Sequence, residues 1–156
     1  MSIEKVREFF RDKGMEERIR EFAVSSATVE LAAQALNCAA CRIAKTLSFH
    51  VGERVVLIVT AGDTKIDNRK YKSCFGMKAK MLSPDETAPL VGYAVGGVCP
   101  FAVNEGVEVY LDRSLKRFET VFPACGSANS AIELSITELE KYTDTKGWVD
   151  VCRIVD

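Results

Sequence analysis

The sequence predicts an α/β domain in which helices surround one mixed, strongly curved and barrel-like sheet. Apolar residues at helical spacing alternate along the chain with short runs that have the alternation or the valine and isoleucine content of strands. Some strand-like runs follow one another directly, as in a hairpin, whereas others are separated by a helix and need a crossover connection. Both kinds of connection in one chain favour a mixed sheet with helices outside it. Residues 1–156 contain no linker, repeat or low-complexity stretch, so we expect a single domain.

The composition is that of an ordinary globular domain. Of the 156 residues, 47% are hydrophobic and 28% are charged, which excludes disorder, collagen and coiled coil. A chain of this length buries roughly 70% of the surface of its unfolded form and needs no metal or disulfide to complete its core. The 21 basic and 22 acidic residues give a net charge of −1, so only a local patch could attract nucleic acid. The chain shows no signal peptide and no apolar run long enough to span a bilayer, so we expect a cytoplasmic protein with no membrane partner.

The first half of the chain leads from two helices into the sheet, and capping residues set the expected boundaries of its elements. In order, we expect a helix over 2–13, an edge strand over 18–22, a helix that Ser26 or Thr28 caps and Asn37 ends, strands over 42–50 and 55–60, and a turn at Gly62-Asp63.

The second half adds more strands and a loop whose glycines and proline disfavour a strand. In order, we expect a helix over 68–75 capped by Asp67, a strand over 77–82, a helix between Ser83 and Gly92, a loop over 93–103, strands over 106–112, 118–122 and 130–136, a short helix opened by a Thr137–Glu140 capping box, and a strand over 148–155.

Lys45 lies in the middle of an expected strand, on the face that it shares with Ile43, Leu47 and Phe49. A lysine on this apolar face has two interpretations. Its stem could cross a buried strand so that the ammonium reaches water at an edge. Alternatively, the ammonium lies at the floor of a polar cleft and donates to an anionic or carbonyl oxygen of a substrate.

The loop Gly96-Gly97-Val98-Cys99-Pro100 is the second unusual feature. Two glycines allow a ligand to approach the backbone closely, and the proline stiffens the exit, so that N–H groups can point at an oxygen or a water. A plain turn is the alternative. The loop lacks the spacing of the dinucleotide and P-loop fingerprints, so we expect no nucleotide cofactor.

The cysteines and the one histidine, His50, offer little catalytic machinery. Six scattered cysteines in a cytosolic-looking chain are expected to be reduced thiols. Cys38 and Cys41 have CxxC spacing, but without a second pair a closed zinc site would need unrelated partners, so we expect no metal. Cys99 has no base nearby in the sequence other than the distant His50, which makes a thiol nucleophile a minor alternative.

The stretch from Thr64 to Lys80 carries six basic residues against one acid, Asp67. This local excess predicts either a solvated face or a surface that contacts phosphates. The six residues are Lys65, Arg69, Lys70, Lys72, Lys78 and Lys80, and Arg113, Lys116 and Arg117 could extend the patch.

Several short motifs occur in one order along nearly the whole chain. They are Thr28-Val29-Glu30, Ala44-Lys45-Thr46-Leu47, Gly62-Asp63, Val95-Gly96-Gly97-Val98-Cys99-Pro100-Phe101 and Ile132-Glu133-Leu134. Together they resemble the YbaK/EbsC family of aminoacyl-tRNA deacylases, which is related to the editing insertion domain of bacterial prolyl-tRNA synthetase. The resemblance implies a cytoplasmic trans-editing enzyme that needs no cofactor and hydrolyses the ester of a mischarged tRNA, usually tRNA for proline.

The resemblance also implies residue roles. The family's lysine falls on Lys45, which would help to hold the terminal aminoacyl-adenosine. Its Gly-x-x-x-Pro loop falls on Gly96 to Pro100, whose backbone would position the attacking water and the carbonyl oxygen. The residues expected to bind the acyl group are Thr28, Val29, Gly126, Asn129 and Ala131, and the basic run from Lys65 to Lys80 would carry the acceptor stem.

The segment 124–134 departs from the branch of the family that acts on tRNA for proline carrying cysteine. Ala124 and Ala131 stand where that branch typically has a serine and an aspartate. The acyl group therefore stays open among Ala, Ser, Cys, Thr and 2-aminobutyrate. The sequence also leaves open the oligomeric state, docking to a prolyl-tRNA synthetase, and two other functions: a non-catalytic binding module with the same pocket, and a thiol hydrolase that uses Cys99.

Overall fold

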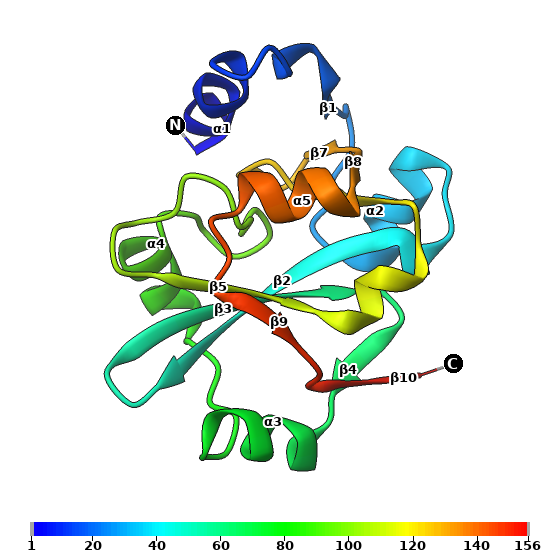
Figure 1. The fold of residues 1–156 in the computed structure, drawn as a ribbon. Coiled ribbons are helices and arrows are strands. Elements are labelled where there is room, and N and C mark those ends of the chain that lie inside the picture. Colours follow the sequence, from blue (N-terminus) through cyan, green and yellow to red (C-terminus); the bar gives the residue numbers. More distant parts are fainter. Residues whose placement is uncertain (1, 156) are drawn as a thin grey trace.

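The computed structural model describes residues 2–155 and has a six-stranded mixed sheet at the centre of the fold (Figure 1). Its strand order is β8-β6-β2-β3-β5-β9, and two-stranded antiparallel ladders, β1-β7 and β4-β10, flank it. The strands are β1 (Ile19–Glu21), β2 (Ile43–Val51), β3 (Arg54–Ala61), β4 (Thr64–Ile66), β5 (Glu108–Asp112), β6 (Thr120–Pro123), β7 (Ser130–Ile132), β8 (Leu134–Ser135), β9 (Gly147–Val149) and β10 (Cys152–Ile154).

Both kinds of strand pairing occur in the central sheet. The hairpin β2-β3 and the pair β6-β8 are antiparallel, whereas β2-β6, β3-β5 and β5-β9 are parallel. The predicted mixed sheet with helices outside is therefore confirmed.

The α-helices begin and end largely where their capping residues predict. They are α1 (Ser2–Arg11), α2 (Val29–Leu36), α3 (Asn68–Phe75), α4 (Pro84–Val91) and α5 (Ile136–Tyr142). Of the two candidate caps of α2, Thr28 is the one used, because its side chain accepts from the Leu31 N–H. Asp67 caps α3, and Ser83 forms a capping box with Glu86 at the start of α4.

Strand β3 passes between two apolar clusters. Leu57 and Val59 face the larger cluster, to which α1, α4 and α5 contribute, and Val56 and Ile58 face a smaller one that contains Tyr71 of α3. Figure 1 accordingly shows α5 and α3 on opposite sides of the sheet. A further cluster joins α2 to Ile43 and Phe122 at one end of β2. With both faces covered in this way, β3 is buried over most of its length, as predicted.

Apart from shifts of a few residues at their ends, four predicted elements differ from the observed ones in kind, in division or in their cap. Residues 77–82 form one bridge, Met81 to Phe49, and no strand. The expected strand over 130–136 is divided into β7 and β8, and the one over 148–155 is divided into β9 and β10, because the two parts pair with different strands. Ser135, with Glu138, makes the capping box of α5, in place of Thr137 and Glu140.

Candidate active site

A cavity of about 450 Å³ opens between the start of α2, the edge of β2, the start of α4 and the loop around Gly96. Small and apolar side chains make up most of its wall. The lining residues are Ser26, Ala27, Thr28, Val29, Ala32, Ile43, Ala44, Lys45, Thr46, Leu47, Ser48, Met81, Leu82, Pro84, Thr87, Val95, Gly96, Val98, Phe122, Ala124, Ser130 and Ala131. Lys45 is the one cation among them.

Strand β2 presents an unpaired stretch of backbone to this cavity. Its parallel pairing with β6 covers Ile43 and Ala44. On the same edge, Ser48 O accepts from Leu82 N–H at 3.1 Å, and His50 N–H donates to Lys80 O at 2.8 Å. Backbone groups of alternate residues point to the same edge of a strand, so the N–H and C=O of Thr46 point into the gap between these two pairings. Thr46 thus adds a backbone donor and acceptor to the wall of the cavity.

The ammonium of Lys45 is held by the protein's own backbone. Lys45 is half-buried, lines the cavity, and its Nζ donates to the carbonyl oxygen of Thr64 in β4. Burial lowers the pKa of this ammonium below its ordinary value, and the neighbouring Cys152 and Asp63 oppose that shift. The geometry therefore fits the second interpretation of Lys45, a cation at the floor of a cleft.

The glycine loop reaches the cavity through Gly96 and Val98. Gly97 N–H closes a turn by donating to Ala94 O at 3.0 Å. A Cβ on Gly97 would lie 2.9 Å from the carbonyl carbon and oxygen of Gly126, so the absence of a side chain at Gly97 lets the two backbone segments pack together. The N–H groups of Gly96 and Val98 have no acceptor among the described residues.

Cys99 and Pro100 do not line the cavity, and the structure corrects the alternative in which Cys99 is a nucleophile. Cys99 is fully buried in the main apolar cluster, where its Sγ lies 3.9 Å from Phe101 O. Burial raises the pKa of its thiol to about 12. A thiol that is shielded from solvent and protonated at neutral pH is a packing residue. All six cysteines are free thiols.

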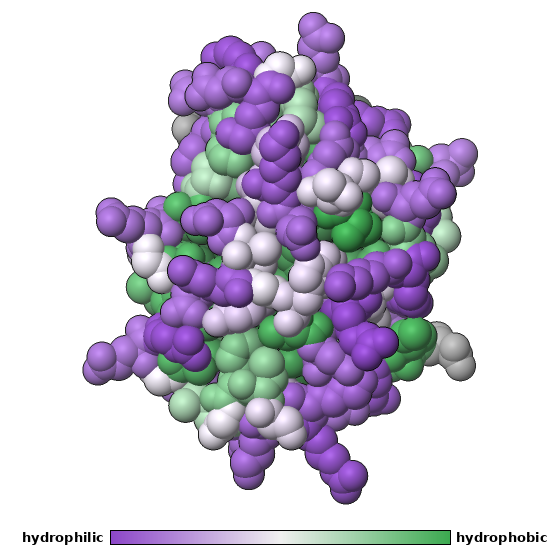
Figure 2. All heavy atoms as spheres, viewed as in Figure 1, coloured by the Kyte–Doolittle hydropathy of each residue, from purple (hydrophilic) through white to green (hydrophobic). Residues whose placement is uncertain are grey.

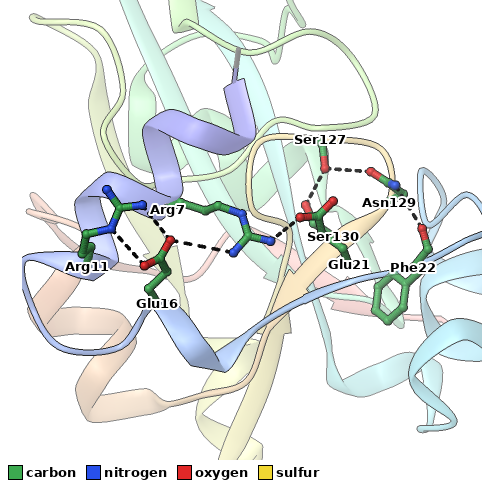
Figure 3. A network of polar contacts seen from close by, with 8 residues as sticks. All are labelled: Arg7, Arg11, Glu16, Glu21, Phe22, Ser127, Asn129 and Ser130. Atoms are coloured by element: carbon green, nitrogen blue, oxygen red, sulfur yellow. Dashed lines mark hydrogen bonds and ion pairs between the residues drawn. The ribbon is translucent and has the colours of Figure 1, made fainter.

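The residues expected at the acyl group divide into two sets. Thr28, Val29 and Ala131 line the cavity, whereas Gly126 and Asn129 do not. Asn129 instead joins two segments, because its Nδ2 donates to Phe22 O at 3.0 Å and its O accepts from Phe22 N–H at 2.8 Å (Figure 3). In the same network Ser127 Oγ contacts Asn129 Oδ1 at 3.0 Å and Ser130 Oγ at 2.6 Å. Asn129 therefore fixes the segment that leads to α2.

The predicted site residues omit several residues of the wall. Met81 and Val95 line the cavity although 56% and 61% of their surface is exposed, so they lie at its rim. Thr87 lines the cavity one turn into α4, where its Oγ1 donates to Ser83 O at 2.8 Å. The capping box at Ser83 is the sequence feature that could have indicated Thr87, since it fixes which residues fall at the start of α4.

None of the six predicted tRNA-binding cations lines this cavity. Lys65 is on β4, Arg69, Lys70 and Lys72 are on α3, and Lys78 and Lys80 follow α3 in the segment that lies beside β2. All are exposed, but Lys70 is engaged by Asp150 Oδ1 at 3.0 Å and Cys152 O at 2.9 Å.

Within residues 2–155, no group of three or more His, Cys, Asp or Glu side chains is arranged to hold a metal ion. In the same residues, the helices are all too short or too polar to cross a bilayer.

Comparison with known protein families matches residues 24–142 to the aminoacyl-tRNA editing domain, which is well over half of the chain. The chain belongs to the aminoacyl-tRNA editing domain family. The family expected from the sequence motifs is thereby confirmed. The matched residues contain the whole wall of the cavity, including Lys45 and the glycine loop.

Relatives of this editing domain include free-standing proteins and parts of larger ligases. The uncharacterized protein YwhH of Bacillus subtilis is 54% identical over 154 residues, which are 98% of each chain. A proline–tRNA ligase of Bacillus cereus is 27% identical over 95 residues, which are 60% of this chain but 16% of the ligase. The crystal structure of a proposed trans-editing enzyme for prolyl-tRNA synthetase superimposes with a TM-score of 0.86 at 26% identity, over 97% of each chain.

Proposed function

We propose that this editing domain is a deacylase that hydrolyses the ester of mischarged tRNA, with tRNA for proline that carries a small non-proline residue as its first candidate substrate. The observation that carries the proposal is the cavity itself. It combines one half-buried cation, Lys45, with unpaired backbone donors and small side chains, in a chain of the editing family. Such an enzyme would work in the cytoplasm, where charged tRNA is found.

The chemistry requires little beyond positioning. A water oxygen attacks the acyl carbon, the ester C–O bond breaks, and a proton passes to the ribose oxygen, so the products are the free amino acid and uncharged tRNA. Charge develops on the carbonyl oxygen during the attack, and donors that are already oriented stabilise it. The resemblance to the deacylases suggests that the terminal ribose hydroxyl assists the proton transfer, so that no histidine or metal is required.

In this mechanism Lys45 is the positioning cation. Its Nζ is fixed by the Thr64 carbonyl on one side, which leaves its other N–H donors for an oxygen of the terminal nucleotide or of the acyl group. The N–H groups of Gly96 and Val98 would bind the developing oxyanion or the attacking water, and the backbone of Thr46 would hold polar atoms of the bound aminoacyl end.

Selection among acyl groups would depend mainly on size. Ala27, Ala32, Ala124 and Ala131 form part of the cavity wall, so the acyl group would be bounded by small side chains that offer it no charged partner. Exclusion by size discriminates more strongly than the loss of one methylene group, which changes binding by about 1–3 kcal/mol. Proline would be spared if its ring does not fit between these alanines.

The deciding experiment is hydrolysis of tRNA for proline that carries Pro, Ala, Cys, Ser, Thr or 2-aminobutyrate. We expect release of one or two small residues, with proline spared. Lys45→Ala should lower kcat/KM by at least about 100-fold, the loss typical for removal of one transition-state donor. Lys13→Ala, a substitution of an exposed lysine at the end of α1, is the matched control and should leave the rate unchanged.

Near-normal hydrolysis by folded Lys45→Ala would contradict the proposed mechanism. Failure of the wild-type protein to hydrolyse any of the six substrates, together with tight binding of tRNA, would instead support the non-catalytic binding module. The same panel with and without prolyl-tRNA synthetase would show whether that enzyme is a partner in selecting the tRNA.

A further inference from the structure

A second cavity, of about 660 Å³, lies on the side of the molecule formed by β4, β10, α3 and the 3-10 turn that follows β5. We call it the basic cleft. It is lined by Thr64, Lys70, Asp112, Arg113, Ser114, Lys116, Arg117, Asp150, Cys152, Arg153 and Ile154. Figure 1 shows the yellow turn of residues 113–117 on the same side of the ribbon as β4 and the red strand β10. The surface over β10 is mostly hydrophilic in Figure 2.

The cleft assembles cations that are far apart in the sequence. Five of its lining residues are basic and two are acidic, although the whole chain has a net charge of −1. Only Lys70 belongs to the basic run from Lys65 to Lys80. Arg113, Lys116 and Arg117, which the sequence offered as a possible extension of that run, come from the turn 113–117, and Arg153 of β10 is the one cation that the sequence did not indicate.

The carboxylates in and beside the cleft leave part of this positive charge unpaired. Buried Asp112 accepts from Ser114 N–H at 3.0 Å and from Val151 N–H at 2.9 Å, so both of its carboxylate oxygens are hydrogen-bonded to backbone N–H groups. Asp150 is shared by Lys70 at 3.0 Å and Arg113 at 3.6 Å, and Asp63 binds Arg117 through both carboxylate oxygens.

Three cations of the cleft remain accessible to an anion. The side chain of Arg113 is 70% exposed. Arg153 and Lys116 are exposed and have no ion-pair partner among residues 2–155, although Lys116 also packs on the Trp148 ring with its Nζ 4.3 Å from the ring centre. Guanidinium and ammonium groups spread along a groove suit successive phosphate groups better than a single small anion.

The basic cleft shares a structural element with the first cavity. Thr64 of β4 lines the cleft, and its carbonyl oxygen accepts the hydrogen bond from Lys45 Nζ in the first cavity. Strand β4 also pairs with β10, which supplies Cys152 and Arg153 to the cleft. The two sites therefore adjoin one another at Lys45 and Thr64, as they must if a single elongated ligand is to place a polar end at Lys45 and an anionic backbone along the cleft.

We propose that the basic cleft binds phosphate groups of the acceptor end of the tRNA whose aminoacyl terminus occupies the first cavity. This inference rests on the proposed function, because it takes the substrate to be an RNA. It assigns the main phosphate contacts to Arg113, Lys116 and Arg153, in place of Lys72, Lys78 and Lys80.

The first test measures binding of uncharged tRNA by fluorescence anisotropy at several salt concentrations. Arg113→Gln/Arg153→Gln should weaken binding by at least about 10-fold at 100 mM salt. The plot of log K against log salt should also become less steep, by about 1.5 in slope, since each phosphate contact contributes roughly 0.7–0.9. The control, Lys13→Gln/Lys141→Gln, removes one exposed lysine from the turn after α1 and one from α5, and should change neither quantity. Equal thermal unfolding of both variants verifies the fold.

The second test separates this inference from the proposed function. Arg113→Gln/Arg153→Gln should raise KM for aminoacyl-tRNA at least about 10-fold but hydrolyse aminoacyl-adenosine, which has no phosphate, at the wild-type rate. Absence of all hydrolysis would overturn the deacylase proposal and leave the anisotropy result to decide on the cleft. Wild-type affinity and salt slope in the double variant, or equal losses in the control or in Lys72→Gln/Lys78→Gln, would overturn the assignment of the cleft.

Discussion

At the scale of single residues, Lys45 combines an apolar surrounding with a hydrogen-bonded ammonium group, two properties that usually exclude one another. It lies between Ile43 and Leu47 on the face of β2 that packs on apolar clusters, yet its ammonium is held by a hydrogen bond to Thr64 O. An ammonium removed from water favours its neutral form, and the hydrogen bond favours its charged form. The net result is a lowered pKa, because burial is the largest influence.

This balance predicts how Lys45 titrates. Its pKa should lie below 10.5, the ordinary lysine value, so the charged form that binds substrate is lost as the pH rises through this lowered pKa. An NMR titration of the lysine Cε and Hε signals would measure it, and Lys45→Ala would assign the signal by its disappearance. Titration of Lys45 together with the exposed lysines would contradict the prediction.

The cysteines give a second prediction at this scale. An alkylating reagent at pH 8 should modify exposed Cys74 well before Cys99 or Cys125, because burial raises the pKa of both buried thiols and shields them from the reagent. Peptide mass spectrometry after a brief reaction would measure the order.

Cys99→Ala should lower the free energy of unfolding by about 1–3 kcal/mol, as a small cavity in a core does, and leave deacylation unchanged. Rapid alkylation of Cys99 in the folded protein would revive the thiol hydrolase.

At the scale of elements, the site depends on two backbone segments that approach closely because Gly97 has no side chain. Gly97→Ala would place a Cβ 2.9 Å from backbone atoms of Gly126, which cannot move aside as a side chain could. We expect a loss of about 1–3 kcal/mol in stability, the usual cost of overpacking, and displacement of the Gly96 and Val98 N–H groups from the cavity.

The activity of Gly97→Ala should therefore fall more than its stability does. Measurement of kcat/KM at a temperature where the variant is fully folded separates the two effects. Gly106→Ala is the control, because a Cβ there meets nothing within 4 Å and Gly106 lies outside the site. It should lose stability through its positive φ but retain its activity.

Element boundaries set by local chemistry could be predicted from the sequence, and those set by distant partners could not. Asp67, Ser83 and Gly92 act on backbone groups within four residues, so their patterns sufficed to place the ends of α3 and α4. The segment 77–82 alternates like a strand, but only Met81 pairs with Phe49, and no local pattern reveals where such a partner stops.

The same distinction applies to the candidate site. Lys45 and the Gly96 loop stand out because their residue types are unusual in their own segments. Arg153 does not, and only the pairing of β4 with β10 brings it into the basic cleft with the turn after β5. Asn129 was expected at the acyl group, but it lies three residues after Gly126 in a segment whose role is to hold Phe22 and the entry to α2.

At the scale of the whole molecule, two carboxylates connect distant parts of the chain and set the response to acid. Arg18 binds Glu138 at 2.8 Å and so joins the segment before β1 to the start of α5, and Glu86 at the start of α4 bonds to Ser83 N–H and His50. These contacts lower the pKa of both carboxyls to about 2, mainly through Arg18 for Glu138 and through the Ser83 N–H for Glu86.

The sign of the pH dependence follows from these shifts. Each carboxyl has a lower pKa in the folded chain than in the unfolded one, whose value is near 4.5, so the unfolded state takes up protons first as the pH falls. The stabilisation is complete above about pH 5 and is lost progressively down to about pH 2. Urea midpoints should therefore decrease over this interval.

Glu138→Gln keeps a side chain that can cap α5 but cannot ionise, so its midpoint should be lower than that of the wild type at pH 7 and decrease less on acidification. The control is Glu119→Gln, at an exposed position outside both ion pairs, and it should follow the wild-type curve. A Glu138→Gln curve parallel to that of the wild type would show that the Arg18 contact does not link α5 to the start of the chain.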